Sequence, residues 1–450
     1  MSDDVTSADA KLNFKRILPV FIIVLVDIMG MTIIIPLLPL YSAAFGANAF
    51  TIGLLSATFP AMQFIASPIL GSLSDRFGRK PVLVISQIGT FLGFILLGLA
   101  NALPILFLSR VIDGISGGNI ATAKASITDC TNEKTRTQGL GLIGAAFGIG
   151  FVIGPAISAI ALVLFDGNFR IPAYIAAGFS LASFLLTTFW FEETHVPNQN
   201  KQTVQKTPYF QKLVQALSHP VIGGLLFLLF VQQLIISEFE QLIPLFTLNR
   251  LGMQGTGNAV LFLFMGLLVA IIQGYLIGPL SRKLGERRLI YGGLVMLAIG
   301  MIGVSLIPEQ PLPSYSQAET LASLASTTSE ASINVDIPDG SNTGYLGVTL
   351  LFVMLLPVTI GGYLVMPSIN SLITQTTSAS EQGQILGIST SIVSMAHIIA
   401  PIAGGALFRW GGSTIAFLAG GILVALVVLA LPLPISRLTF WDNIPSTIQE

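Results

Sequence analysis

Charged residues are scarce in this chain. Only 10% of its 450 residues are charged, whereas 53% are hydrophobic and the mean hydropathy is +0.81. Soluble domains carry about 25% charged residues, so a water-soluble fold of this length could not cover its surface with so few. The sequence therefore predicts a protein of the lipid bilayer, whose hydrocarbon core is crossed by about 20 mostly apolar residues.

Several signals of chemistry are also missing. The single cysteine, Cys130, excludes an internal disulfide and a cysteine-based metal site. No Gly-x4-Gly-Lys-Ser/Thr loop supports ATP hydrolysis, and no nucleophile elbow suggests an enzyme. The net charge of −1 offers no basic field to nucleic acid. We expect no metal, no cofactor and no nucleic-acid partner, and energy from an ion gradient or from the substrate's own gradient.

Long apolar stretches follow one another along the chain. Only helices or closed barrels satisfy their backbone in lipid, and these stretches are too long for barrel strands. The sequence predicts an all-α membrane protein of twelve spans in two pseudo-symmetric six-helix bundles. The predicted spans are 17–40, 51–70, 82–100, 104–128, 137–165, 171–191, 221–245, 257–280, 289–307, 345–374, 383–408 and 413–432. The first span follows a polar start without the cleavage site of a secretory signal.

The spans divide the chain into an N-terminal bundle over 1–191, a linker over 192–220 and a C-terminal bundle over 221–450. Basic residues favour the cytoplasmic side of a membrane. With both termini in the cytoplasm, 16 of the 21 Lys and Arg residues fall inside and three fall outside. The external loop 309–343 is rich in Ser and Thr and carries five acids but no Lys or Arg. This composition indicates a mobile surface loop.

The two halves repeat each other. Ile35-Pro36-Leu37 returns as Ile243-Pro244-Leu245, and the segment 71–80 returns as 278–287. Gly154-Pro155 is answered by Ala400-Pro401 at a larger offset, which an insertion of the size of loop 309–343 explains. Two equivalent bundles can rock about a central site and expose it to each side in turn.

The segment Gly71-Ser-Leu-Ser-Asp75-Arg76-Phe-Gly78-Arg79-Lys80 resembles the cytoplasmic signature of the major facilitator superfamily. The fifth-span run Gly144-x3-Gly148-x-Gly150-x3-Gly154-Pro155 resembles its antiporter motif, and Arg110 with Gly114 its fourth-span motif. Asp27 with Pro36 and Pro39 is similar to the first span of 12-span drug/proton antiporters such as tetracycline exporters. The resemblance implies the fold above and exchange of a substrate for protons. The sequence departs from it at Ser158 and Ala159, where the antiporter motif has glycine, and in the charges Asp113 and Lys124.

Three charged residues of the first half are candidates for proton coupling: Asp27, Arg110 and Asp113. Asp27 lies about 15 Å into its span at helical rise, where a charge costs about 3 kcal/mol or more unless it faces a cavity or a partner. Arg110 and Asp113 are three residues apart and share a helix face. They form either a pair that breaks on protonation or a permanent ion pair that orders the bundle. Lys124 either snorkels to water or contacts an anionic substrate.

Four polar residues of the second half are candidates for the substrate cavity: Gln233, Glu238, Glu240 and His397. Glu238 and Glu240 are two apart and point to different faces of the seventh span, so we expect one of them to line the cavity. His397 titrates near neutral pH. It is either functional or a satisfied polar contact inside the bundle.

The remaining candidates are mechanical. The resemblance implies a cytoplasmic gate formed by Gly71, Asp75, Arg76, Gly78, Arg79 and Lys80, acting as a charge latch that holds the outward-facing state and breaks on opening. Four-residue glycine spacing, including Gly150 and Gly154, permits close helix approach. Pro155 bends its helix by removing a backbone hydrogen bond, and Pro401 is the counterpart of Pro155.

These features together predict a secondary active transporter that works by alternating access. Proton-coupled efflux of amphipathic, drug-like compounds agrees best with Asp27 and the fifth span. A proton-coupled or facilitated importer of a small polar metabolite is the alternative, and a membrane sensor or scaffold without transport has little support. We expect a multi-pass protein of a bacterial inner membrane that works as a monomer, with lipid, protons and a small-molecule substrate as its partners.

Overall fold

The computed structural model describes residues 14–131, 135–194, 209–325, 334–377 and 379–430. Within these ranges the chain forms helices and turns, with no strand. The helices of the first half are α1 (Phe14–Ile34), α2 (Leu38–Ala44), α3 (Ala49–Phe77), α4 (Arg79–Leu99), α5 (Leu103–Gly117), α6 (Asn119–Asp129), α7 (Arg136–Leu164) and α8 (Arg170–Phe189).

The second half contains three long single helices and one very long one. Its elements are α9 (Tyr209–Ser218), α10 (Pro220–Leu251), α11 (Gly255–Ile271), a π-helical turn η2 (Ile272–Leu276), α12 (Ile277–Leu284), α13 (Glu286–Ser305), α14 (Gln317–Ala325), α15 (Leu346–Thr376) and α16 (Ala379–Ala430). The run from α11 to α12 reads as one span interrupted by the π-helical turn, which is a common device inside long helices.

The predicted all-α membrane fold is confirmed, whereas the count of twelve spans remains a prediction. Ten helices of the described ranges are long and apolar enough to cross a membrane. Two local features account for the difference from twelve. The predicted fourth span is broken into α5 and α6 at Gly118, and the predicted eleventh and twelfth spans run together as α16, whose backbone leaves helical geometry at Gly412. The prediction of a continuous fourth helix was wrong.

The repeated sequence produces a repeated turn. Gly78 between α3 and α4 has φ 99° and ψ 162°, and Gly285 between α12 and α13 has φ 77° and ψ 154°. Only glycine adopts this region of backbone space at low cost. Both halves therefore use the same glycine to reverse the chain between consecutive helices, as the offset of the repeat predicts.

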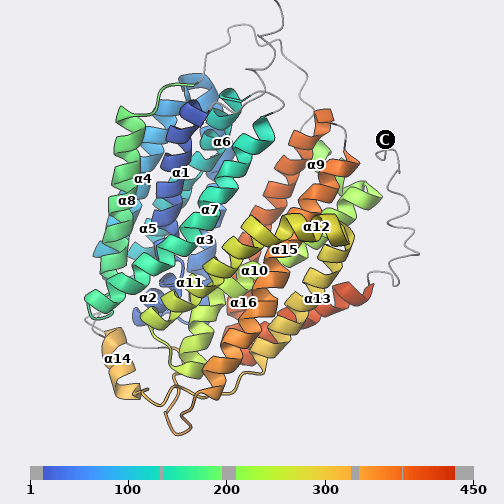
Figure 1. Ribbon diagram of the computed structural model, residues 1–450. Helices are drawn as coiled ribbons and strands as arrows, with labels where there is room; N and C mark the ends of the chain where they lie inside the picture. Colours follow the sequence, from blue (N-terminus) through green and yellow to red (C-terminus); the bar gives the residue numbers. More distant parts are fainter. Residues whose placement is uncertain (1–13, 132–134, 195–208, 326–333, 378, 431–450) are drawn as a thin grey trace, which may run out of the picture.

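The two bundles lie against each other at the end that carries α14, which we call the loop end (Figure 1). Here the contacts are made through small residues. A methyl group on Gly53 of α3 would collide with the carbonyl of Pro401 in α16, and one on Gly405 would lie 2.6 Å from the carbonyl oxygen of Ala49. The aromatic rings of Phe50 and Trp410 lie 5.5 Å apart across the same contact.

The bundles diverge toward the opposite end, the linker end, where α8 ends and α9 begins (Figure 1). Outside the glycine's own helix backbone, no atom of the described residues lies within 4 Å of a methyl group placed on Gly71 of α3 or Gly141 of α7. Side chains near the linker end of α3 are correspondingly exposed, for example Ile69 at 56%. The two bundles are thus in contact at the loop end and apart at the linker end.

The long external segment contains ordered structure. The prediction of a loop without regular structure was wrong over 317–325, which form α14. Leu324 of α14 is buried in a core cluster of the first half, and the Asn334 amide donates to the carbonyl of Gly46 over 2.9 Å. The segment also contacts the second half, where the backbone N–H of Gln310 donates to the backbone carbonyl of Arg250. It therefore bridges both bundles at the loop end.

Candidate functional site

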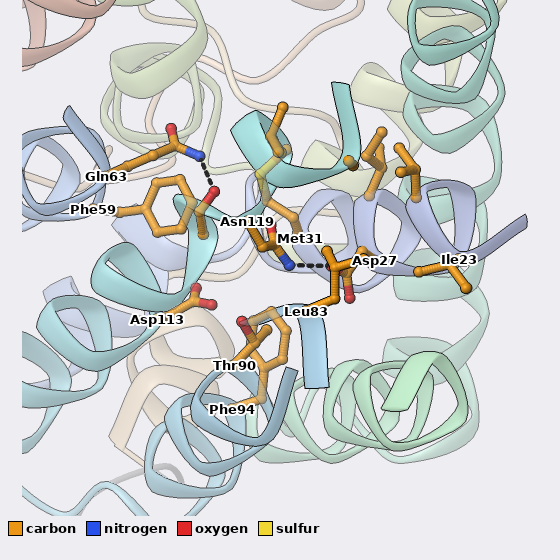
Figure 2. A pocket seen from close by; sticks show the side chains of 15 residues that line it. Ile23, Asp27, Met31, Phe59, Gln63, Leu83, Thr90, Phe94, Asp113 and Asn119 are labelled. Carbon is orange, nitrogen blue, oxygen red and sulfur yellow. Dashed lines mark hydrogen bonds between the residues drawn. The ribbon is translucent and has the colours of Figure 1, made fainter. Parts of the chain in front are cut away.

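A pocket lies inside the first bundle, between α1, α3, α4, α5 and α6 (Figure 2). Its cavity volume is about 40 Å³, room for a few water molecules, and the looser space between the lining side chains is about 540 Å³ with open solvent included. Its polar side chains are few against a mostly apolar wall. The lining residues are Ile23, Val24, Asp27, Ile28, Met31, Phe59, Gln63, Leu83, Thr90, Phe94, Asp113, Gly117, Asn119, Ile120 and Ala123.

Asp27 of α1 is one of two acids in this pocket. Its Oδ2 accepts a hydrogen bond from the amide of Asn119 over 2.8 Å (Figure 2). Its Oδ1 is buried and accepts no hydrogen bond of standard geometry among the described residues, while the side chain of Ser183 lies near the carboxylate. An unpartnered carboxylate oxygen at membrane depth is costly as an anion, so this oxygen is available to a proton or to a ligand. The expectation that Asp27 faces a cavity agrees with its position.

Asp113 of α5 is the second acid and reaches the pocket from another helix. Its Oδ2 lies 3.1 Å from Nη1 of Arg110, and both side chains are almost fully buried. The Arg110 guanidinium also lies over the ring of Phe94, 5.6 Å from its centre, a cation–π contact. The predicted pairing of these two residues is present. Because Arg110 is paired with Asp113, it does not neutralise Asp27.

The break between α5 and α6 shapes the pocket. It leaves the carbonyl of Gly117 outside the regular helix, where the Gln63 side chain of α3 donates to it over 2.8 Å. Gly117 and Asn119 on either side of the break line the pocket. Irregular backbone at membrane depth is tolerated where it lines a cavity or is buried in protein, so a helix break at this position is itself an indication of a functional site.

The predicted cavity residues of the second half do not line this pocket. Glu240 of α10 accepts a hydrogen bond from the hydroxyl of Tyr363 in α15, and Gln233 donates its amide to the sulfur of Met366, also in α15. Gln233 and Glu240 are seven residues apart and share a face of α10. His397 lies on α16 and is partly exposed. These three residues belong to helices that lie apart from the pocket of the first bundle.

Glu238 points elsewhere. Only 6% of it is exposed, and a methyl group on Gly404 of α16 would lie 2.7 Å from its Cγ. Glu238 is therefore packed inside the second bundle against α16, while Glu240 contacts α15. The structure separates the two glutamates, as their two-residue spacing predicts.

A second polar cluster lies at the linker end of the first bundle. Arg79 at the start of α4 pairs with Asp75 of α3 over 2.6 Å and with Asp129 of α6 over 2.9 Å. It also donates to the hydroxyl of Ser74. The carboxylate of Glu193, just after α8, accepts from the backbone amides of Arg79 and Lys80. Its negative charge is favourable at this helix N-terminus.

These bonds join four helix ends of one bundle. A rigid-body separation of the two bundles leaves them intact, and they are present although the linker end is open. In this conformation the Asp75–Arg79 pair is formed, and the latch that breaks on opening stays a prediction. Of the other gate candidates, Arg76 places its guanidinium over the ring of Phe77 at 5.1 Å, and Gly71 faces open space.

Two of the predicted packing glycines make close contacts. Gly150 and Gly154 of α7 lie against Ile28 and Thr32 of α1, and the Thr32 hydroxyl donates to the carbonyl of Gly150 over 2.8 Å. Gly144 and Gly148 of the same run have no such neighbour. Pro155 lies inside α7 and Pro401 inside α16. The small-residue contact thus occupies only part of the predicted stripe.

Sequence reasoning missed several polar residues of both clusters. Asn119 and Gln63 hold the pocket, and Asp129 and Glu193 hold the linker-end turn. A signal was present for two of them, because acids at the inner ends of apolar spans depart from the basic pattern expected there. The contacts themselves join residues 50 to 114 positions apart, a separation that no local spacing reveals.

Comparison with known proteins places this architecture in a family. A family model described as Major Facilitator Superfamily matches residues 20–326. The class E tetracycline resistance protein of Escherichia coli is 29% identical over 429 residues, which cover 92% of this chain and 94% of that protein. Multidrug resistance protein 2 of Bacillus subtilis (strain 168) is 29% identical over 287 residues, which cover 62% and 71%.

Solved structures show the same fold at greater distance. The crystal structure of the human organic anion transporter MFSD10 (TETRAN) superposes with a TM-score of 0.62 at 20% identity. The match covers 93% of this chain and 99% of that one. At this identity the likeness supports the arrangement of helices and says nothing about the substrate.

Proposed function

The chain belongs to the major facilitator superfamily, and on that premise we propose that it is a secondary active transporter that exports amphipathic, drug-like molecules in exchange for protons. It is a multi-pass membrane protein. The names of its relatives, tetracycline and multidrug resistance proteins, support export of drugs over import of a metabolite.

One observation carries the proposal: a pocket between five helices holds two acids at membrane depth, one paired with arginine and the other, Asp27, with a buried oxygen that accepts no hydrogen bond among the described residues. Asp27 can bind a proton at Oδ1 without losing the hydrogen bond from Asn119 to Oδ2. Aromatic and aliphatic walls from Phe59, Phe94 and Met31 suit an amphipathic molecule. Proton and substrate would thus meet in one pocket.

The orientation of the protein in the membrane follows from the distribution of its basic residues. With the linker end in the cytoplasm, both termini are inside and the protein sits in the inner membrane of a bacterium. The conformation described above is then the inward-facing one, ready to take substrate from the cell. Rocking of the bundles would close the linker end and open the loop end, where the substrate leaves and a proton enters. The protein needs no other cofactor and acts as a monomer.

Reconstitution tests the proposal. Purified protein is placed in liposomes with tetracycline as the probe, and substrate and proton fluxes are followed under a pH gradient. Protons should move opposite to the probe, and dissipating the gradient should stop accumulation. Flux of the probe that is indifferent to the pH gradient would reject proton coupling, and co-transport in the same direction would favour the importer.

The variant Asp27→Asn keeps the side-chain volume and the hydrogen bond to Asn119 but cannot carry a proton. We expect it to lose proton-driven accumulation by about 100-fold, the scale of a lost proton-transfer group, while still catalysing exchange of substrate for substrate. Asp27→Glu serves as the matched control and should retain part of the coupled activity. An Asp27→Asn protein that accumulates the probe as fast and as far as the unmodified protein would remove Asp27 from the mechanism.

A further inference from the structure

Glu238 is a buried acid that the mechanism above does not use. It lies in α10, inside the second bundle, and only 6% of it is exposed. Its Oε1 is buried without a hydrogen-bond partner, and no ion pair involves it among the described residues. Two glycines of α16 make room for it: methyl groups on Gly404 and Gly420 would lie 3.0 Å from its Oε1 and 3.2 Å from its Oε2.

The titratable groups around Glu238 do not balance its charge. On its own helix, Glu240 is bonded to Tyr363 of α15. On α16, His397 lies seven residues, or two turns, before Gly404. On α13, the neighbour is Met301, which meets α16 at Gly420. A carboxylate without a cation or donors is not tolerated in such a place, so Glu238 is protonated in this conformation.

Two consecutive glycines of α16 connect the surroundings of Glu238 with the contact between the bundles. Gly404 lies against Glu238, and the next residue, Gly405, lies against Ala49 and Gly53 of α3. The α3–α16 contact is the closure at the loop end described above. At these two consecutive glycines, α16 presents backbone without a side chain both to Glu238 and to α3. When the loop end opens, α3 leaves α16, and water reaches glycines that no side chain covers.

From this juxtaposition we propose that Glu238 is a second proton-exchange site of the transport cycle, reached from the loop end when α3 separates from α16. A proton from external water binds a Glu238 carboxylate oxygen when the loop end is open. It stays bound after α3 and α16 close on each other, and it is released to cytoplasmic water while the linker end is open, before the loop end opens again. The proposal rests on the proton-coupled transport proposed above. With Asp27 in the first bundle, it gives two protons for each substrate molecule.

The proton number per cycle can be measured as a zero-flux ratio. Proteoliposomes with the membrane potential clamped to zero are given a fixed gradient of one pH unit, and the tetracycline gradient is varied until net flux stops. Each coupled proton balances about a tenfold substrate gradient per pH unit. We expect a ratio of about 100-fold for the unmodified protein and about tenfold for Glu238→Gln.

Glu240→Gln is the matched control, because it removes an acid from the same helix and leaves Glu238 in place. It should keep the ratio of about 100-fold expected of two protons. An unchanged ratio in Glu238→Gln, with the unmodified protein still driven by the pH gradient, would overturn the second site and leave the proposed function standing. A ratio that ignores the pH gradient in the unmodified protein would instead overturn the proposed function.

Carbodiimide labelling tests the site in protein that keeps Glu238. The reagent reacts with protonated carboxyl groups in apolar surroundings, and the adduct is located by peptide mass spectrometry. In a Cys130→Ser background, Phe50→Cys and Trp410→Cys are joined by a short reversible thiol cross-linker, which holds the loop end closed. Labelling of Glu238 should fall at least about tenfold on cross-linking and return on reduction. Equal labelling in both forms, or none in either, would show that the loop end does not control access to Glu238.

Discussion

The two bundles share one frame but handle buried charge differently. In the first bundle, Asp113 is paired with Arg110, and both Asp27 and Asp113 line the pocket. In the second, Glu238 is packed against glycine and has no partner at Oε1. The repeat therefore duplicates helices and turns without duplicating the groups that carry charge. The difference indicates that both bundles contribute alike to the repeated helix architecture, whereas their buried charged groups have different roles.

The turns at the linker end sharpen this comparison. Ser74 and Arg79 in the first bundle occupy the same repeat positions as Ser281 and Glu286 in the second, and each pair is hydrogen-bonded. The charge at the ninth position of the repeat is reversed, and its other partners change with it. Arg79 pairs with Asp129 of α6, whereas Glu286 accepts from Ser371 and Gln375 of α15. The two turns therefore keep the same backbone geometry, although the charge at this position is positive in one and negative in the other.

The largest expected difference is in the free energy of unfolding. It separates a variant that removes one partner of a buried ion pair from a variant that removes an unpaired buried acid. Arg110→Leu leaves Asp113 buried and unpaired, which we expect to cost about 3–5 kcal/mol of unfolding free energy. Glu238→Gln replaces a neutral acid by a neutral amide of the same size and should change that free energy by less than about 1 kcal/mol. Thermal and denaturant unfolding of the purified proteins in detergent measures both.

The double variant Arg110→Leu with Asp113→Leu is the control. It removes both charges and should recover most of the lost stability without recovering transport. If Arg110→Leu is no less stable than Glu238→Gln, the Arg110–Asp113 pair does not stabilise the first bundle, and the contrast between the halves fails.

A smaller effect is expected at the linker-end turns. Arg79→Gln loses its ion pairs with Asp75 and Asp129, of which the first is half exposed and correspondingly weak. We expect a loss of about 1.5–3 kcal/mol, the range for a charged hydrogen bond, and about a tenfold lower initial rate of transport. Glu286→Gln keeps an amide oxygen for Ser281 and Ser371, so its rate should fall less than about threefold.

Arg79→Lys separates charge from geometry, because lysine keeps the charge but cannot bridge Ser74, Asp75 and Asp129 together. It should lie between the other two variants. Equal losses for Arg79→Gln and Glu286→Gln would mean that the two turns contribute alike, whatever the sign of their charges.

Much of the fold could be predicted from the sequence because its causes are local. Apolar length sets the spans, and the glycines at 78 and 285 mark the turns through a backbone angle that other residues avoid. The break at Gly118 was missed although Gly117-Gly118 is a local signal for it; the tertiary part, the carbonyl of Gly117 accepting from Gln63 of another helix, could not be predicted. Helix α14 was missed because a polar composition was taken as a sign of disorder, while Leu324 is buried against the first bundle.

The residues of the candidate site likewise fall into those that local sequence features predict and those that only tertiary contacts identify. Asp27 stands out by its depth in an apolar span, and Arg110 with Asp113 by their helical spacing. Which face of α10 meets α15 and which meets α16 depends on the rotation of that helix, so the sequence could not say which glutamate is sealed. Asn119 is an ordinary polar residue in the sequence, and only the break beside it and the distance to Asp27 give it a role.

The smallest expected effect compares the two turn glycines. Gly78→Ala and Gly285→Ala both place a side chain at a positive φ, at a cost of about 1–3 kcal/mol each. At Gly285 no atom lies within 4 Å of the added methyl group, whereas at Gly78 it would lie 3.0 Å from Cδ of Glu193 and displace the carboxylate that caps α4. We therefore expect Gly78→Ala to be the less stable by about 1 kcal/mol, the loss of one cap, when unfolding is measured in detergent.

The added loss at Gly78 has a specific cause that a second substitution isolates. Glu193→Gln removes the negative charge from the N-terminus of α4 and should cost about 0.3–1 kcal/mol by itself. Combined with Gly78→Ala, it should add little, because both changes disturb the same cap and the two costs are not independent. Full additivity would mean that the methyl group at residue 78 acts through backbone strain alone, and the two turns would then be equivalent in energy as they are in geometry.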